Sequence, residues 1–381
     1  MKLYLINLIS FGLRTKWGYL GYKHNGQKDN IYKYITQAEL DDIKLIINDK
    51  NNRVVLYAVS EGWSADAIIN ILEHLNVTTE TSNVKLIVDS CAIDWIPDNH
   101  LNFPTIYYSH DMMKVANYED HYGCNTEINL DTGKFLYLMG KPYKPQRVGL
   151  LHKLYCSGLL EHCEWSFKIT DGIYEKTRNI LPELSKEEFD SFVSKTLRNI
   201  DDINTEQFGS DRYFYEGIPY DHTMYAKTSF SLISETIIMP KCITEKTWRT
   251  ISNRHAFVTL GDTDFFKWLN SIGLNTFDHL RVDDSNNHYI DNGIASVKTM
   301  LERINDSSEN TKKAIESNYE NYRRLVALSR GQVDEVIEPY LVQPRDNNPT
   351  RIILVEGSNA IRAIDKLWCP LQESNSRPTD Y

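Results

Sequence analysis

Three consecutive residues about two thirds of the way along the chain, Thr244, Glu245 and Lys246, have the side chains that a phosphate-bearing ligand needs. An apolar strand expected at 230–236 precedes them, and they open a helix. The first amide groups of a helix lack partners within it and carry a partial positive charge, so they favour a diphosphate. Lys246 adds a formal charge on the same turn, and the Glu245 carboxylate can accept hydrogen bonds from both hydroxyl groups of a ribose.

The same three residues have a purely structural interpretation. Threonine is a favoured N-cap, glutamate suits the first turn because of the helix dipole, and a lysine at this place is ordinarily solvated. From the residues alone, both interpretations stay open.

A second group of cationic residues follows the strand expected at 134–139. Lys141, Lys144 and Arg147 lie in a turn with two prolines, before a leucine-rich helix. Arginine forms a forked contact with phosphate, whereas lysine acts as a point charge. If both strands belong to one parallel sheet, this turn faces the same crevice as the Thr244 turn. A solvated basic loop is the alternative.

A further cation, Arg212, lies in the polar and irregular stretch 170–218, just before Tyr215-Glu216-Gly217. We interpret this segment as a substrate-facing loop in which Arg212 contacts a phosphate or a sugar. An ordinary surface loop is the alternative.

The elements that must position these residues follow an α/β pattern. Short apolar runs alternate with helical periodicity along the chain, which is typical of βαβ units and parallel sheets. The pattern restarts near residue 134. We therefore expect one α/β domain over 1–133, a second α/β domain with the Thr244 turn over 134–345, and an extension with a disordered tail over 346–381.

The composition limits the kinds of partner and compartment. A formal net charge of -10 repels polyanions over most of the surface, although it leaves room for a local basic groove. The six cysteines show no metal-binding spacing and are interpreted as reduced thiols of a cytoplasmic protein. The sequence shows neither a signal peptide nor a run of membrane-spanning length, so we expect no membrane partner.

Three motifs around the Thr244 turn resemble those of a known family. They are Phe230-x-x-x-Ser234-Glu235-Thr236, Ile243-Thr-Glu-Lys-Thr-Trp-Arg249 and Ala256-Phe-Val-Thr-Leu-Gly261. Over about residues 208–280 the chain resembles the donor-binding segment of the fucosyltransferase-like glycosyltransferases. That resemblance implies an α/β fold of two Rossmann-like domains that face each other across a cleft, the GT-B type.

The resemblance also implies which residues hold a donor. Glu245 would hold the ribose of a UDP- or GDP-sugar and Lys246 its phosphates, with no tightly bound cofactor. The 134–345 domain would bind this donor, and the 1–133 domain would present the acceptor. We count five further residues of the second domain among the donor-binding candidates: Thr244, Glu235, Arg147, Lys141 and Arg212.

Two further segments, 268–278 and 138–147, resemble a version found among bacteriophage and giant-virus glycosyltransferases. This resemblance implies a specific acceptor, the hydroxyl group of hydroxymethylated cytosine in double-stranded phage DNA. A glycan or protein acceptor for the same fold is an alternative. A non-catalytic sugar-nucleotide-binding protein that keeps Glu245 and Lys246 is another.

Transfer of a sugar with inversion needs a base that takes the proton of the acceptor hydroxyl. We expect this base in the first domain, where polar residues follow the ends of the strands. Glu61 and Asp111 are the favoured candidates, and His110 is a third. The alternative for each is a helix N-cap or a solvated group.

One pair of carboxylates has the spacing of a metal site. Asp262 and Asp264 follow a strand in a D-x-D pattern, and such a pair can share Mg²⁺ or Mn²⁺. The pair leads directly into a helix, however, so helix capping explains it, and its place after the Thr244 helix fits the metal-free two-domain type. We therefore expect no metal site.

Overall fold

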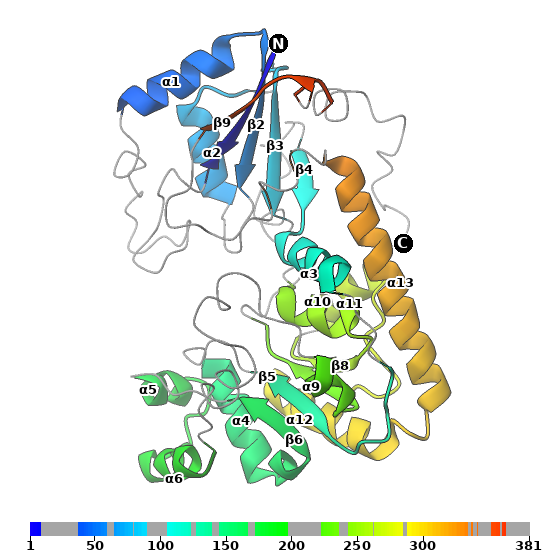
Figure 1. Ribbon diagram of the computed structural model, residues 1–381. Helices are drawn as coiled ribbons and strands as arrows, with labels where there is room; N and C mark the ends of the chain where they lie inside the picture. Colours follow the sequence, from blue (N-terminus) through cyan, green and yellow to red (C-terminus); the bar gives the residue numbers. More distant parts are fainter. Residues whose placement is uncertain are drawn as a thin grey trace. The chain divides into compact units, whose positions relative to one another are not determined.

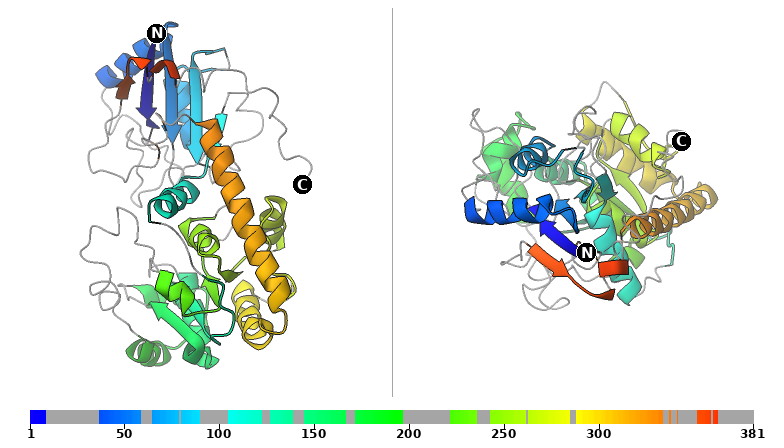
Figure 2. Two further views of the ribbon diagram at one scale, coloured as in Figure 1. Left: turned by 45° about the vertical axis from the view of Figure 1, so that its right-hand side comes forward. Right: turned by 90° about the horizontal axis from the view of Figure 1, so that it is seen from above.

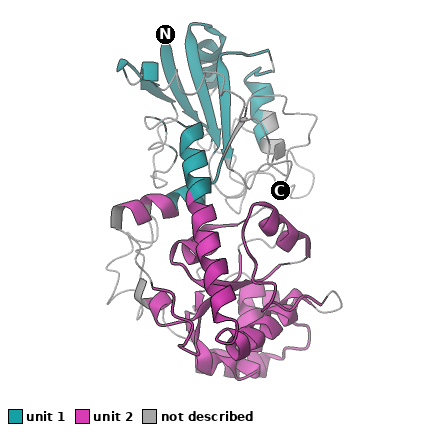
Figure 3. Ribbon diagram, turned by 90° about the vertical axis from the view of Figure 1, so that its right-hand side faces the viewer, with its two compact units in different colours: residues 1–114, 324–380 teal, residues 115–323, 381 magenta. Residues whose placement is uncertain are grey.

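The computed structural model shows a mixed α/β protein with two sheets whose strands are mostly parallel (Figure 1). It describes residues 1–8, 37–58, 65–78, 80–89, 105–122, 127–138, 145–166, 172–196, 222–235, 243–261, 263–284, 288–333, 337, 341, 352–358 and 360–362. The chain divides into two compact units, shown in Figure 3. Unit 1 comprises Met1–Lys114 and Arg324–Asp380, and unit 2 comprises Val115–Arg323.

Unit 1 contains a five-stranded sheet with the order β4-β3-β2-β1-β9. Four strands are parallel, and β9 runs antiparallel to β1 at one edge. The elements of this unit are β1 (Lys2–Asn7), α1 (Gln37–Asn48), β2 (Asn52–Ala58), α2 (Ala65–His74), β3 (Val84–Asp89), β4 (Thr105–Tyr108), the first residues of α3 (His110–Tyr122) and β9 (Ile352–Val355).

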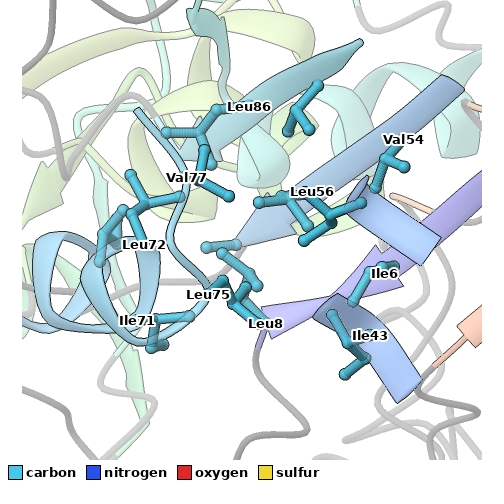
Figure 4. Packing of buried hydrophobic residues seen from close by; sticks show 14 of the residues in the cluster. Ile6, Leu8, Ile43, Val54, Leu56, Ile71, Leu72, Leu75, Val77 and Leu86 are labelled. Carbon is cyan, nitrogen blue, oxygen red and sulfur yellow. The ribbon is translucent and has the colours of Figure 1, made fainter. Parts of the chain in front are cut away.

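The core of unit 1 forms where α1 and α2 pack on one face of this sheet (Figure 4). Ile43 of α1 and Ile71 of α2 meet strand residues such as Leu56 and Leu86, all without exposed surface. Burying one such aliphatic side chain stabilises the fold by about 1.5–3 kcal/mol. Intervening strand residues such as Val55 and Ile87 are buried as well, whereas Lys85 is only partly buried. Apolar runs without polar alternation are therefore expected of these parallel strands.

Strand β9 lies in the segment that the sequence predicts to be an extension and disordered tail, 346–381. The two views in Figure 2 show β9, in red, beside β1, in blue. Ile352 pairs with Ile6, and Val355 pairs with Leu3. The first part of the extension therefore adds a strand to the sheet, whereas residues 363–381 lie outside the described part of the chain.

Unit 2 contains a four-stranded, fully parallel sheet with the order β6-β5-β7-β8. Its strands are β5 (Phe135–Leu138), β6 (Cys163–Ser166), β7 (Phe230–Ile233) and β8 (Ala256–Thr259). Its helices are α4 (Pro145–Cys156), the short 3₁₀ helix η4 (Leu159–His162), α5 (Ile173–Arg178), α6 (Lys186–Thr196), α9 (His222–Ala226), α10 (Glu245–Ser252), α11 (Thr263–Ser271), α12 (Tyr289–Arg303) and most of α13 (Ser308–Gln332).

The strand order of unit 2 reverses between β5 and β7. The chain passes from β5 through α4 to β6 on one side, and from β7 through α10 to β8 on the other. Open α/β sheets bind ligands beyond the carboxyl ends of their strands at such a reversal. In the described part of unit 1, β1 to β4 follow one another in sequence order without a reversal. The topology therefore favours a ligand site in unit 2.

Two local predictions are confirmed by side-chain and backbone geometry. Ser185 and Glu188 form the capping box at the start of α6, with N–H to side-chain oxygen distances of 3.0 and 3.2 Å. Gly273 follows α11 in a left-handed conformation with φ of 84°, which a glycine tolerates without strain. Local signals therefore predicted these two helix ends.

The division of the chain differs from the sequence prediction. The sequence places domain boundaries at 133 and 345, whereas the compact units divide at 114 and 323. Both divisions fall inside continuous helices, α3 and α13. No change of composition marks such a point, since the helical pattern continues through it. Among the described residues, no helix has both the length and the apolar character needed to cross a membrane.

Candidate functional site

The start of α10 has an unusual N-cap. Thr244 occupies the N-cap position with extended backbone angles, φ -107° and ψ -174°, but its side chain caps no amide of the helix. An N-cap threonine ordinarily accepts a hydrogen bond from the second or third amide of its helix. The structural interpretation of this residue from the sequence therefore does not describe what its hydroxyl group does.

The hydroxyl group of Thr244 instead contacts Glu235, which follows β7. Glu235 is fully buried. One carboxylate oxygen, Oε2, accepts from Thr244 Oγ1 at 2.5 Å, and the other, Oε1, accepts from the Thr244 N–H at 3.1 Å and from Thr247 Oγ1 at 2.6 Å. Buried carboxylates need such donors to offset their lost hydration. Glu235 thereby fixes the first turn of α10 to the end of β7.

Lys246 lies beside this carboxylate and is only partly solvated, with 18% of its side chain exposed. Its Nζ donates to Thr244 Oγ1 at 2.9 Å and to Glu245 Oε1 at 3.0 Å, and it lies 4.0 Å from Glu235 Oε2. The sequence-based alternative of a solvated lysine is therefore wrong for this residue. The ammonium group is held at the opening of α10.

Glu245 is the most accessible member of the cluster, with 28% of its side chain exposed. Burial of the carboxyl group acts to raise its pKa, but the positive charges of Lys246 and Arg249 outweigh that effect. The pKa of Glu245 is consequently held well below its usual range, and the group is an anion at neutral pH. A carboxylate of this kind accepts hydrogen bonds from ligand hydroxyl groups.

Arg147 belongs to the first turn of α4, after β5, and not to the preceding basic turn where the sequence places it. Only 2% of this residue is exposed. Its backbone oxygen accepts from the hydroxyl group of Tyr137, on β5, at 3.0 Å. The leucine-rich pattern predicted the helix α4, but nothing in the sequence predicted that the cation Arg147 at its start is buried.

Tyr137, on β5, lies close to the first turn of α4 and to the end of β7, on the two sides of the strand reversal. Burial raises the pKa of its hydroxyl group well above the usual range, and the nearby charge of Arg147 partly offsets that rise. Ser234, which precedes Glu235 in the chain, lies beside the same hydroxyl group. The neighbourhood of Arg147 thus adjoins that of Glu235 through one aromatic side chain.

The structure brings four predicted residues into direct contact: Glu235, Thr244, Glu245 and Lys246. Three other candidates, Lys141, Arg212 and Glu61, lie outside the described residues, as does Asp262 of the D-x-D pair. Asp264 is exposed and its carboxylate pairs with Lys267 at 3.4 Å. Among the described residues, no group of three or more potential ligands has the geometry to hold a metal ion.

The remaining base candidates, His110 and Asp111, are the first two residues of α3 and are both buried. Asp111 lies in the first turn, where the helix dipole favours a carboxylate. Asp111 is therefore neither an N-cap nor a solvated group, which were the structural alternatives for this residue. Both residues belong to unit 1, whereas the cluster around Lys246 belongs to unit 2.

Two members of the site, Thr247 and Tyr137, were missed by the sequence analysis. Thr247 follows Thr244 by three residues, and a spacing of three places both side chains on the same side of a helix start. That spacing is a usable signal for a shared partner. Tyr137 lies within an apolar strand run, where nothing in the sequence distinguishes it from a core residue.

Comparison of the chain with models of protein families finds no family that matches, and a search of curated proteins finds no similar sequence. The resemblance to fucosyltransferase-like glycosyltransferases therefore rests on the motifs quoted above.

Proposed function

We propose that this protein is a glycosyltransferase that binds a nucleoside-diphosphate sugar at the opening of α10. The observation that carries this proposal is the reversal of strand order between β5 and β7. The two helices that leave this reversal, α4 and α10, carry Arg147 and Lys246 in their first turns. A diphosphate bound there would meet the ammonium group of Lys246 and the positive end of a helix dipole, and the buried charge of Arg147 would act on it only through space.

The chemistry asked of Lys246 is electrostatic. When a sugar leaves its donor, negative charge grows on the departing nucleoside diphosphate. An ammonium group held in a partly desolvated place stabilises that charge more strongly than a solvated one. Lys246 meets this description, since most of its side chain is buried and its position is fixed by Thr244 and Glu245.

Glu245 has the complementary role of holding the sugar-like part of the nucleotide. Its carboxylate is ionised and partly exposed, so it can accept hydrogen bonds from both hydroxyl groups of a ribose. The donor is a UDP- or GDP-sugar. The resemblance to the fucosyltransferase-like family supports the same two assignments.

The proposed arrangement is the GT-B type, with the donor in unit 2 and the acceptor presented by unit 1. The two predominantly parallel sheets support this proposal. The base that takes the acceptor proton would then come from unit 1, and Asp111, His110 and Glu61 are its candidates. The reaction proceeds with inversion and needs no metal ion. We propose the cytoplasm as its compartment.

The proposed acceptor is a hydroxyl group, with hydroxymethylated cytosine of phage DNA as the specific candidate. The net charge of -10 requires such DNA to meet a local basic surface. One alternative is an acceptor on a glycan or a protein, which the salt dependence of acceptor binding distinguishes from DNA. The other is binding of the donor without transfer, which a measurement of turnover distinguishes.

A thermal-shift screen tests the donor directly. The full chain is heated with UDP, GDP, CMP and the corresponding sugar nucleotides. A ligand at 100 times its dissociation constant stabilises the native state by about 2.7 kcal/mol, which corresponds to a rise in melting temperature of about 5–10 °C for a unit of this size. A rise with UDP or GDP and none with CMP supports the proposal. Unchanged melting with every nucleoside diphosphate contradicts it.

A further inference from the structure

The cluster around Lys246 contains a chain of two hydrogen bonds with a fixed direction. A carboxylate with no proton only accepts hydrogen bonds, so the Thr244 hydroxyl group gives its one proton to Glu235. The Thr244 oxygen is then left as an acceptor, and Lys246 Nζ donates to it at 2.9 Å. The order is therefore Lys246 to Thr244 to Glu235.

Exposure separates the members of this chain by what a ligand can touch. Glu235 and Thr244 have no exposed surface. The Lys246 side chain is partly exposed, so of these three side chains it is the one that offers surface to an incoming phosphate. Any effect of Glu235 or Thr244 on such a ligand must therefore pass through Lys246 or through the first turn of α10.

These two hydrogen bonds also involve the side chain that would otherwise cap α10, that of Thr244. The Thr244 hydroxyl group accepts no hydrogen bond from an amide of α10, although Thr244 is the N-cap residue of that helix. An N-cap threonine ordinarily accepts from an amide of its own helix, whereas this hydroxyl group is bound to Glu235 and Lys246. Its diversion to Glu235 and Lys246 orients a cation while the opening of the helix stays uncapped by its own N-cap.

We propose that Glu235 and Thr244 are positioning residues that hold the Lys246 ammonium group in place for a diphosphate. This inference rests on the proposed function, because it takes the ligand of Lys246 to be the diphosphate of the donor. It assigns Glu235 and Thr244 a role that differs from the direct donor contact expected from the sequence.

Thr247 provides a matched control for this role. It is buried like Thr244, and its hydroxyl group also donates to Glu235, at 2.6 Å. Among the described residues, however, Lys246 donates to Thr244 and Glu245 and not to Thr247. Thr244→Val and Thr247→Val therefore remove similar bonds to the same carboxylate, and only the first also removes an oxygen to which Lys246 donates.

The experiment is calorimetric titration of the full chain with inorganic pyrophosphate, and with UDP and GDP. Thr244→Val should weaken binding of pyrophosphate about 10-fold or more, since it releases a charge-assisted contact that fixes the cation. Thr247→Val should weaken it less than 3-fold, and Thr244→Ser should restore it. Equal losses in the two valine variants would show that the hydroxyl groups serve only the fold, and would overturn the inference.

A double-mutant cycle with Lys246→Ala adds a result that a structural role does not produce. If Thr244 acts through Lys246, Thr244→Val should cause no further loss of pyrophosphate binding in the Lys246→Ala background. Independent losses that multiply contradict the inference. If Thr244→Val does not fold, Glu235→Gln replaces it in the same cycle, with the exposed Glu302→Gln as its control.

The two proposals fail in different ways. If the wild-type chain binds neither pyrophosphate nor UDP nor GDP, the proposed function fails, and the positioning role falls with it. If the wild-type chain binds them and the two valine variants behave alike, only the positioning role fails.

Discussion

The buried histidine of unit 2, His255, should make the stability of that unit depend on pH. Its Nε2 lies 2.7 Å from the Thr228 carbonyl oxygen, and its Nδ1 lies 2.8 Å from Ser231 Oγ. A carbonyl oxygen only accepts, so Nε2 carries the proton and Nδ1 accepts from Ser231. Burial lowers the pKa of His255 from 6.5 to about 4. The neutral ring therefore joins the segment before β7, β7 itself and the residue that precedes β8.

The sign and size of the effect follow from this difference in pKa. Between pH 6.5 and pH 4 the unfolded chain binds a proton at His255 and the folded chain does not, so acid favours unfolding. The stabilisation is present above pH 6.5 and is lost as the pH falls through about 4. The whole effect is about 3 kcal/mol, of which about 2 kcal/mol is lost between pH 7 and pH 5.

The assay compares wild-type protein with His255→Gln, which keeps an amide donor for Thr228 but does not titrate. Urea unfolding at pH 7 and pH 5 is followed by hydrogen exchange in peptides that span β7 and β8. The wild-type chain should lose about 2 kcal/mol more than the variant over this range. His162→Gln, at an exposed position, should behave like wild type. Equal pH dependence in wild-type protein and His255→Gln refutes the reasoning.

Three further predictions concern packing, charge and the reaction. Glu235→Gln should lower the free energy of unfolding of unit 2 by about 2–4 kcal/mol, because it weakens three hydrogen bonds to a buried carboxylate. The control, Glu302→Gln, should change that free energy by less than about 0.5 kcal/mol, and denaturant unfolding of both variants measures the difference. Gly261→Ala should lower the free energy of unfolding by about 1–3 kcal/mol, since an added Cβ would overlap the Phe265 ring. In Gly331→Ala the added Cβ meets no atom within 4 Å, so this variant should be as stable as wild type or more stable. Equal melting temperatures of the two variants would contradict this packing. Transfer activity should survive EDTA, and its loss in EDTA would support a metal site that includes Asp264. Binding of a DNA acceptor should weaken steeply between about 50 and 200 mM salt, whereas binding of a glycan should not.

The sequence was sufficient for features that depend on neighbours in the chain. The start of α10 at Glu245 and the capping box of Ser185 are set by residues within one helical turn, so local patterns predict them. The apolar runs of β2 and β3 likewise predict buried parallel strands.

Features that depend on distant residues could not be predicted in this way. Glu235 lies nine residues before Thr244, and only the fold brings its carboxylate against that hydroxyl group. The burial of Arg147 depends on what packs around the start of α4, and β9 becomes a strand only because β1 offers it an edge. In each case tertiary contacts decide what the local pattern leaves open.

The central claim is that the opening of α10 binds the diphosphate of a sugar nucleotide, and titration calorimetry of Lys246→Ala with UDP and GDP tests it most directly. Lys267→Ala, which removes an exposed lysine of the same unit, is the control. Wild-type protein and Lys267→Ala should bind one of the two nucleotides with equal affinity, and Lys246→Ala should bind it about 10–100-fold more weakly. Equal affinity of Lys246→Ala and wild-type protein, or binding of neither nucleotide to the wild-type chain, would contradict the claim.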